Sequence, residues 1–540
     1  MRAEGSALRP SNARWIFVLL VVIALVRIIY TYQAVAQTVD ETPNIACGMQ
    51  WLDQGRYDMG PFHPPLARAA IAVGPYLYGM RSQGLADRWK EGNAILHSRG
   101  KYAVALTLAR VGVLPFFVLA AVCVWLWGRR LLGEAGGLAA VFIFTNTPMV
   151  LAHAGIATTD MAVAAGIVFA LYRFTRWLEA PDLRRSVWLG VAVALAVLAK
   201  FSALLIVPLC GAGILAAYCI SQRRFPPLRV TPILLTAAVA ILVIWAGYRF
   251  DVGKLREPAE SGLTEHSAFW RGVSQVPLPA PLLLDGLLLV KSLNRDGHAA
   301  YLFGEVRQTG WWYFFPVALG VKTPLAILML ALVGLFAATR ARREWMQYAP
   351  GLCCLAILAG CLPSHLNTGL RYILCIFPML ALLAAQGLML LWGAAAWRCA
   401  GIALMVWLTV TSVLAHPDYI PYFNALAGAH PERIIVDSDL DWGQDMKRLV
   451  WKLRELKVEK VTMSILWSGD DSKIGLPAWD GLEPYKPVTG WVAISYVNQK
   501  TQGLLIAKSM GRADSAYAWL DRYQPVTRVG KSILLYYVPE

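Results

Sequence analysis

Apolar and polar stretches alternate along most of this chain. Apolar runs close to 20 residues long are separated by polar loops as far as residue 415. Because a helix needs roughly 20 residues to cross the hydrocarbon of a bilayer, the pattern predicts about eleven membrane-spanning helices. We expect them near residues 15–35, 103–128, 136–152, 158–178, 187–200, 201–220, 230–250, 320–339, 348–361, 369–391 and 392–415.

The apolar stretch 187–220 is too long for one span. A single helix of this length would measure about 50 Å at roughly 1.5 Å per residue, whereas the hydrocarbon core is about 30 Å thick. The sequence therefore predicts two short helices that turn near Lys200.

The pattern changes after residue 415, where short apolar runs favour strands. The expected elements are strands at 433–436, 461–467, 491–497 and 532–538, and helices at 442–456 and near 513–520. The predicted fold is a polytopic α-helical membrane protein with a small C-terminal α/β domain. The domains are a transmembrane domain at 1–415, with loops 36–102 and 251–319 on its outer side, and a soluble domain at 416–540.

Composition agrees with a membrane protein. Hydrophobic residues make up 57% of the 540 residues and charged residues only 16%, which excludes an ordinary soluble protein. The net charge of +16 could indicate a nucleic-acid partner, but no basic run is interleaved with aromatic residues. We therefore expect no nucleic acid as a partner.

Arginines concentrate in every second loop, beginning with the N-terminal segment. Cytoplasmic loops are enriched in Lys and Arg, so the N-terminus is expected in the cytoplasm. The two long loops and the C-terminal domain would then lie outside the plasma (inner) membrane. Ala34-Val35-Ala36 resembles a signal-peptidase site, but the run before it is long for a signal peptide, so a retained first span is preferred.

Charged residues stand at the predicted outer ends of several spans, where membrane burial makes them costly. Acids and bases both occur there: Asp40, Glu41, Asp160, Lys200, Lys322 and Arg371. The three cations lie on the face that the loop charges disfavour. A lipid phosphate would explain them, because Arg binds phosphate as a fork and Lys as a point charge.

The carboxylates beside these cations would allow acid–base catalysis of a group transfer. A carboxylate can take a proton from an attacking nucleophile, while cations stabilise the charge that develops on a departing phosphate. Simpler alternatives remain for each residue. Lys322 and Arg371 could extend to lipid headgroups, Lys200 could form a structural ion pair with Asp160, His63 could cap a turn, and Glu41 could be a solvated neighbour of Asp40.

Several motifs, in this order, resemble those of polytopic glycosyltransferases that use polyprenyl-phosphate sugars. This group is the protein O-mannosyltransferase and aminoarabinose-transferase superfamily of the GT-C fold, in particular a bacterial subgroup. The matching motifs are Asp40-Glu41, His63-Pro64-Pro65-Leu66, Thr159-Asp160-Met161, Ala199-Lys200-Phe201, Gly310-Trp311-Trp312 with Lys322-Thr323-Pro324, Gly369-Leu370-Arg371-Tyr372, and the block from His416 to Asp445.

The resemblance implies an inverting transfer of a sugar from a polyprenyl-phosphate donor, within membrane lipids, to an extracytoplasmic acceptor: a protein hydroxyl, a glycolipid or a glycan. Asp40 would be the general base, with Glu41 beside it. Asp160 would orient the acceptor or a metal. Phosphate and substrate binding would fall to His63, Arg68, Lys200, Lys322 and Arg371.

No cofactor is certain from the sequence, although a divalent metal ion is possible. Asp437, Asp439 and Asp441 in the C-terminal part are spaced like metal-binding carboxylates. The preferred interpretation is that Asp439 and Asp441 cap the helix that follows them.

Two other functions fit parts of the pattern. A transporter or flippase of a lipid-phosphate substrate is the main alternative, but such proteins often show repeats and place their charges at the middle of the membrane. Neither feature is evident in this sequence. A structural or sensory membrane protein would explain the C-terminal domain and leave the outer charges without a role.

Overall fold

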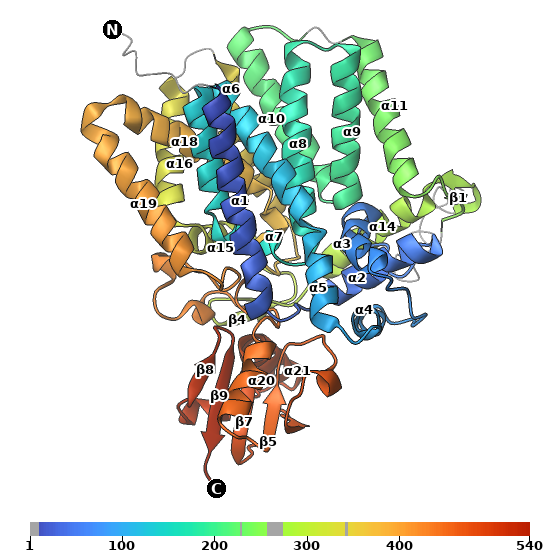
Figure 1. Ribbon diagram of the computed structural model, residues 1–540, viewed down its shortest axis with the longest axis vertical. Helices are drawn as coiled ribbons and strands as arrows, with labels where there is room; N and C mark the ends of the chain where they lie inside the picture. The colour runs from blue at the N-terminus through green and yellow to red at the C-terminus, as the bar shows by residue number, and fades with distance from the viewer. Residues whose placement is uncertain (1–9, 227–228, 256–273, 341–343) are drawn as a thin grey trace.

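The computed structural model describes residues 10–226, 229–255, 274–340 and 344–540. A bundle of long helices forms most of the molecule, and a small sheet domain lies at one end of it (Figure 1). The helices of the bundle are α1 (Pro10–Ala34), α5 (Tyr102–Val111), α6 (Leu114–Thr145), α7 (Pro148–Ala154), α8 (Asp160–Glu179), α9 (Leu183–Ala199), α10 (Ala203–Gln222), α11 (Val230–Gly247), α15 (Phe314–Lys322), α16 (Leu325–Arg340), α17 (Trp345–Cys361), α18 (Ile376–Gly393) and α19 (Arg398–Leu414).

Seven helices in the described residues are long and apolar enough to cross a membrane, or eight if the pair α15 and α16, bent by 113°, forms one span. The lower number than the predicted eleven has two causes. Helices α9 and α17 have only 17 residues each and are not counted among the seven. Helix α6 is continuous with α5 in this count but is broken at Gly133.

Helix α6 turns back on itself at Gly133, which has a φ of 75°. Its two arms pack closely, because a Cβ atom at Gly128 would lie 3.0 Å from the Cα atom of Gly137. The predicted helices near 103–128 and 136–152 are thus the two arms of a hairpin. The predicted turn near Lys200 is also present, between the end of α9 and the start of α10.

The segments between these helices form a layer at the end of the bundle that faces the sheet domain (Figure 1). This layer contains α2 (Glu41–Met49), α3 (Pro65–Leu77), α4 (Arg88–His97) and α14 (Pro281–Asp296), with the short hairpin of β3 (Ala300–Leu302) and β4 (Glu305–Arg307). Every residue of α2 is buried. The layer therefore brings the end of α1 into the interior of the protein.

The C-terminal domain contains a five-stranded sheet in the order β6-β5-β7-β9-β8. Strand β5 is parallel to β6 and β7, whereas β9 is antiparallel to β7 and β8. The elements are α20 (Met446–Glu455), β5 (Lys460–Ser464), β6 (Ala478–Gly481), β7 (Gly490–Ser495), α21 (Gly503–Ser509), β8 (Thr527–Val529) and β9 (Ile533–Val538). The predicted small α/β domain is confirmed.

Two predicted elements of this domain are wrong. Residues 433–436 form no strand; Ile435 and Val436 are fully buried in two different cores, one in the helical bundle and one in the sheet domain. The predicted helix near 513–520 is a short 3-10 helix, η9 (Ala518–Arg522). An apolar run that lies between two cores is buried on both sides, and this burial mimics a strand in the sequence.

Candidate active site

Asp40 and Glu41 are adjacent in sequence but have different environments. The Glu41 side chain is fully buried and accepts two hydrogen bonds from Arg110, at 2.7 and 2.8 Å. Its oxygens also accept the backbone amides of Thr38 and Ala157. The Asp40 side chain is 35% exposed, and its Oδ2 accepts a hydrogen bond of 2.6 Å from Arg371. Glu41 is thus a structural carboxylate, whereas Asp40 is accessible.

Asp160, the first residue of α8, lies in the same cluster. Its side chain is 1% exposed, and its Oδ1 accepts a 2.7 Å hydrogen bond from Nζ of Lys200 in the turn between α9 and α10. Its Oδ2 lies 4.0 Å from the Arg371 guanidinium. Arg371 therefore lies between Asp40 and Asp160, and the four predicted residues form one cluster of two acids and two cations.

Residues 415–445 join α19 to α20, and this stretch, here called the C-terminal segment, holds Arg371 in place. The Arg371 guanidinium lies 4.3 Å from the centre of the Trp442 ring. The Asp439 carboxylate accepts the backbone amide of Leu370, which begins the 3-10 helix η2 (Leu370–Ile373). Gly369 has a φ of 137°, and a Cβ there would lie 2.3 Å from the Ser438 Oγ atom, so only glycine fits. Residues 438–442 therefore set the position of Arg371.

The predicted capping role of Asp439 and Asp441 is wrong. The residue before α20 is Asp445, and no side chain caps that helix. Asp441 instead accepts the backbone amides of Val497, at 3.0 Å, and Gly443, at 3.4 Å. Burial raises the pKa of Asp441 to about 7 and that of Asp437 to about 6. Asp441 thus joins its segment to the sheet domain, whereas Asp437 accepts the amide of its neighbour Ser438.

The C-terminal segment also surrounds Lys322, the third predicted cation. The Lys322 side chain is fully buried, and its Nζ donates to the carbonyl oxygens of Ile420, at 2.6 Å, and Asp439, at 2.5 Å. These contacts join α15 to the segment that supports Arg371. The predicted binding of phosphate by Lys322 stays a prediction.

His63 and Arg68 lie in the layer of short helices. Arg68 is buried and donates to the side chains of Asn44 and Tyr57 and to the carbonyl oxygen of Gly60. The Nδ1 atom of His63 is buried without a hydrogen-bond partner. Burial, together with Arg68 and Lys200, holds the pKa of His63 well below its usual range, so its ring is neutral at pH 7.

His153, on α7, is a residue that the sequence analysis missed. It is buried, its Nδ1 has no hydrogen-bond partner, and its ring centre lies 6.0 Å from that of Trp442. It is close enough to interact electrostatically with Asp160 and Arg371. A histidine inside an apolar segment is costly in a membrane, and that cost was the available signal.

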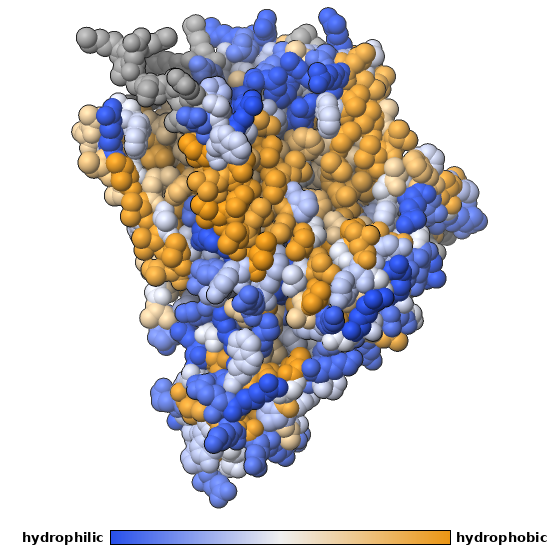
Figure 2. Space-filling view, viewed as in Figure 1, coloured by the Kyte–Doolittle hydropathy of each residue, from blue (hydrophilic) through white to orange (hydrophobic). Residues whose placement is uncertain are grey.

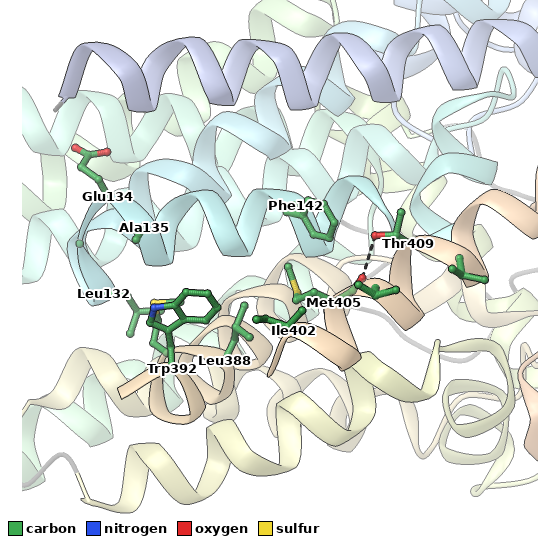
Figure 3. Close-up of a pocket in the computed structure, with 13 residues that line it drawn as sticks. Leu132, Glu134, Ala135, Phe142, Leu388, Trp392, Ile402, Met405 and Thr409 are labelled. Carbon is green, nitrogen blue, oxygen red and sulfur yellow. Dashed lines mark hydrogen bonds between the residues drawn. The ribbon is translucent and has the colours of Figure 1, made fainter. Parts of the chain in front are cut away.

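Among the described residues, no group of three or more His, Cys, Asp and Glu side chains is arranged to hold a metal ion. A cavity of about 950 Å³ lies between α6, α18 and α19, away from the charged cluster. Figure 3 shows that apolar side chains line it, among them Phe142, Trp392 and Met405. Glu134 is the one acid in this lining, and it pairs with Arg129 at 3.7 Å.

One protein-family model matches part of this chain. Residues 103–248 match the model of the dolichyl-phosphate-mannose-protein mannosyltransferase family. The predicted resemblance is confirmed over this segment. The matched family is one of glycosyltransferases, so the finding supports an enzyme and gives no support to a transporter or flippase. No curated protein sequence matches the chain.

Solved structures of similar architecture include ArnT from Cupriavidus metallidurans bound to undecaprenyl phosphate, with 13% identity, a TM-score of 0.48 and coverage of 96% of this chain and 97% of that one. A second is the oligosaccharyltransferase AglB from Archaeoglobus fulgidus, in complex with an inhibitory peptide and a dolichol-phosphate. It has 12% identity and a TM-score of 0.49, with coverage of 97% of this chain and 74% of that one. The apo form of the oligosaccharyltransferase from the same organism has 14% identity and a TM-score of 0.48. The match covers 79% of this chain and 56% of that one, so this chain spans about half of its length.

Proposed function

We propose that this protein is a membrane glycosyltransferase that moves a sugar from a polyprenyl-phosphate donor to an acceptor on the side of the membrane where the C-terminal domain lies. The observation that carries the proposal is the contact of Arg371 with Asp40 at 2.6 Å, next to the ion pair of Asp160 and Lys200. The match of residues 103–248 to a mannosyltransferase family supports it.

In the proposed reaction an acceptor hydroxyl attacks the anomeric carbon of the sugar on the face opposite the phosphate. The bond between that carbon and the phosphate oxygen breaks, and the polyprenyl phosphate leaves with the electron pair. Asp40 takes the hydroxyl proton, because its carboxylate is partly exposed. Glu41 is excluded from this role because Arg110 and two backbone amides already occupy its oxygens.

Lys200 and Arg371 are the proposed phosphate-binding groups. Both cations are paired with carboxylates. A phosphate that binds them competes with Asp40 for the Arg371 guanidinium, and a weaker contact leaves the Asp40 carboxylate free to accept the proton of the acceptor hydroxyl. Asp160 holds the two cations in place. Arg68 and Lys322 donate to carbonyl oxygens of the layer and of the C-terminal segment, and their predicted binding of phosphate stays a prediction.

The proposed location is the plasma (inner) membrane, with the N-terminus in the cytoplasm and the C-terminal domain outside. The arginine-rich loops support this orientation. Figure 2 shows hydrophilic residues at both ends of the bundle and a hydrophobic band between them. The candidate site lies at the end near the C-terminal domain, so the acceptor would be extracytoplasmic.

The test is a transfer assay with purified protein and radiolabelled polyprenyl-phosphate sugars, with mannose and aminoarabinose as alternative donors. Acceptors are a hydroxyl-containing peptide, a glycolipid and a glycan. We expect Asp40→Asn to lower kcat by about 10²–10⁴-fold, the usual contribution of a general base. Asp296→Asn is the matched control, because Asp296 is an exposed acid of the same layer.

Full transfer activity in the Asp40→Asn variant would overturn the proposed role of Asp40. Failure of the wild-type protein to release a sugar from either donor, combined with movement of the intact lipid across vesicle membranes, would overturn the proposed enzyme in favour of a flippase.

A further inference from the structure

A second cluster of charged residues lies at the other end of α8. A cavity of about 360 Å³ is lined there by the side chains of Arg173, Arg176, Asp182, Arg184, Arg185 and Trp188. They come from the last turns of α8, the turn that follows, and the first turns of α9. Four arginines and a single acid line a cavity of this size, so the lining itself is strongly positive.

Two of these arginines have acidic partners. Arg185 pairs with Asp182 at 3.2 Å. Arg176 pairs with Glu179 at 3.0 Å, and Glu179 is shared with Arg130 from α6. The neighbouring acids are thus already used by other arginines.

Arg173 and Arg184 have no acidic partner among the described residues. The Nε atom of Arg173 is also buried without a hydrogen-bond partner. A buried donor that lacks an acceptor is unfavourable, and nearby guanidinium groups repel one another. An anion in the cavity would supply both the missing acceptor and the missing charge.

The surroundings of the cavity identify the source of the anion. Leu183, Val187 and Trp188 are exposed on the first turns of α9, beside the arginines. Tryptophan is enriched where a membrane meets water, and the Arg173 guanidinium lies 5.4 Å from the centre of the Trp188 ring. A phosphate bound by the arginines would therefore have apolar side chains next to it, where an acyl chain could lie.

We propose that this cavity binds the phosphate group of an anionic membrane phospholipid. Guanidinium groups bind phosphate oxygens as planar forks, and basic pockets between membrane helices bind lipid headgroups on the cytoplasmic side. The cavity is distinct from the candidate active site, because the 20 residues of α8 separate them by about 30 Å at roughly 1.5 Å per residue. The inference does not depend on the proposed sugar transfer.

The test is thermal unfolding of the purified full-length protein in detergent, with added phosphatidylglycerol, phosphatidylcholine or inorganic phosphate. We expect phosphatidylglycerol to raise the unfolding temperature of the wild-type protein, and the other two additives to have little effect. In the Arg173→Gln/Arg184→Gln variant we expect the phosphatidylglycerol concentration needed for half of this shift to rise at least about tenfold, since each charged hydrogen bond contributes about that factor.

Arg224→Gln/Arg229→Gln is the matched control, because it removes two exposed arginines from another loop of the same face. It should respond to phosphatidylglycerol as the wild type does. Arg184→Gln alone keeps the test informative if the double variant does not fold, because Arg184 is exposed. An unchanged response in both cavity variants would overturn the site. An equal effect of inorganic phosphate on the wild type would overturn the lipid as its ligand, and an equal effect of phosphatidylcholine would overturn the role of the phosphate charge.

Discussion

The two ends of α8 handle charge in opposite ways. At its start, Asp160 pairs with Lys200 and lies 4.0 Å from Arg371, which also binds Asp40, so two acids balance two cations. At its end, arginines outnumber the acids that could pair with them. In the cluster at the start of α8 every charged group has a partner of opposite charge, so a ligand must compete with these internal partners. In the cluster at the end of α8 some arginines have no acidic partner, and a bound anion would neutralise their charge.

The largest expected effect comes from breaking the balanced end. Lys200→Met would leave the buried Asp160 carboxylate without its 2.7 Å partner. Removing one partner of a buried ion pair costs about 3–5 kcal/mol, so we expect a clear fall in the unfolding temperature. Arg184→Met, the same kind of change at the unbalanced end, should alter stability by no more than about 0.5 kcal/mol, because an exposed side chain is replaced.

A second variant tests the cause of that loss. Lys200→Met/Asp160→Asn removes both charges, and we expect it to recover part of the stability that Lys200→Met loses. Equal unfolding temperatures for Lys200→Met and the wild type would contradict the balanced description of this end.

Helix lengths were predictable from the sequence because they follow from local chemistry. The turn near Lys200 was found by comparing the length of an apolar run with the thickness of a bilayer, and α9 and α10 end and begin on either side of it. Residue types also indicated a phosphate-like ligand for the cations at that end. Local patterns could not show that Arg371 contacts Asp40, 331 residues away in the chain.

Lys200 and Lys322 illustrate this limit. Both follow apolar residues in similar contexts. Lys200 faces a carboxylate, whereas Lys322 faces two carbonyl oxygens of the C-terminal segment. The difference depends on where residues 420 and 439 fold, and no pattern around Lys322 records it. The same segment explains why Asp439, predicted as a helix cap, instead binds the backbone beside Arg371.

A smaller effect on activity is expected when Arg371 is replaced by lysine, which keeps the positive charge and loses the planar guanidinium. Arg371→Lys retains a cation, but a lysine cannot bridge Asp40 and Asp160 while it stacks on Trp442. We expect KM for the polyprenyl-phosphate donor to rise about tenfold, the equivalent of one lost charged hydrogen bond. Steady-state kinetics with the donor varied would measure this.

Arg224→Lys is the matched control, because it makes the same change at an exposed arginine just after α10, and it should leave KM for the donor unaltered. Wild-type kinetics in Arg371→Lys would show that the fork of this arginine is not needed, and the proposed phosphate-binding role would then rest on Lys200 alone.

The smallest expected effect is a local response to pH in the segment behind Arg371. Burial raises the pKa of Asp437 to about 6 and of Asp441 to about 7, above the values of an unfolded chain. The fold therefore favours the protonated acids, and stability falls as pH rises from about 4 through these pKa values. Hydrogen exchange at residues 437–445, corrected for intrinsic rates, should be slower at pH 5 than at pH 8.

The arginine cavity supplies the internal reference for this measurement. Arginine stays protonated across that range, so exchange at residues 173–188 should change little between the two pH values. Slower exchange of residues 437–445 at pH 8 would contradict the raised pKa values of Asp437 and Asp441. An equal change at both places would point to a global effect of pH on the protein and would contradict a local response of Asp437 and Asp441.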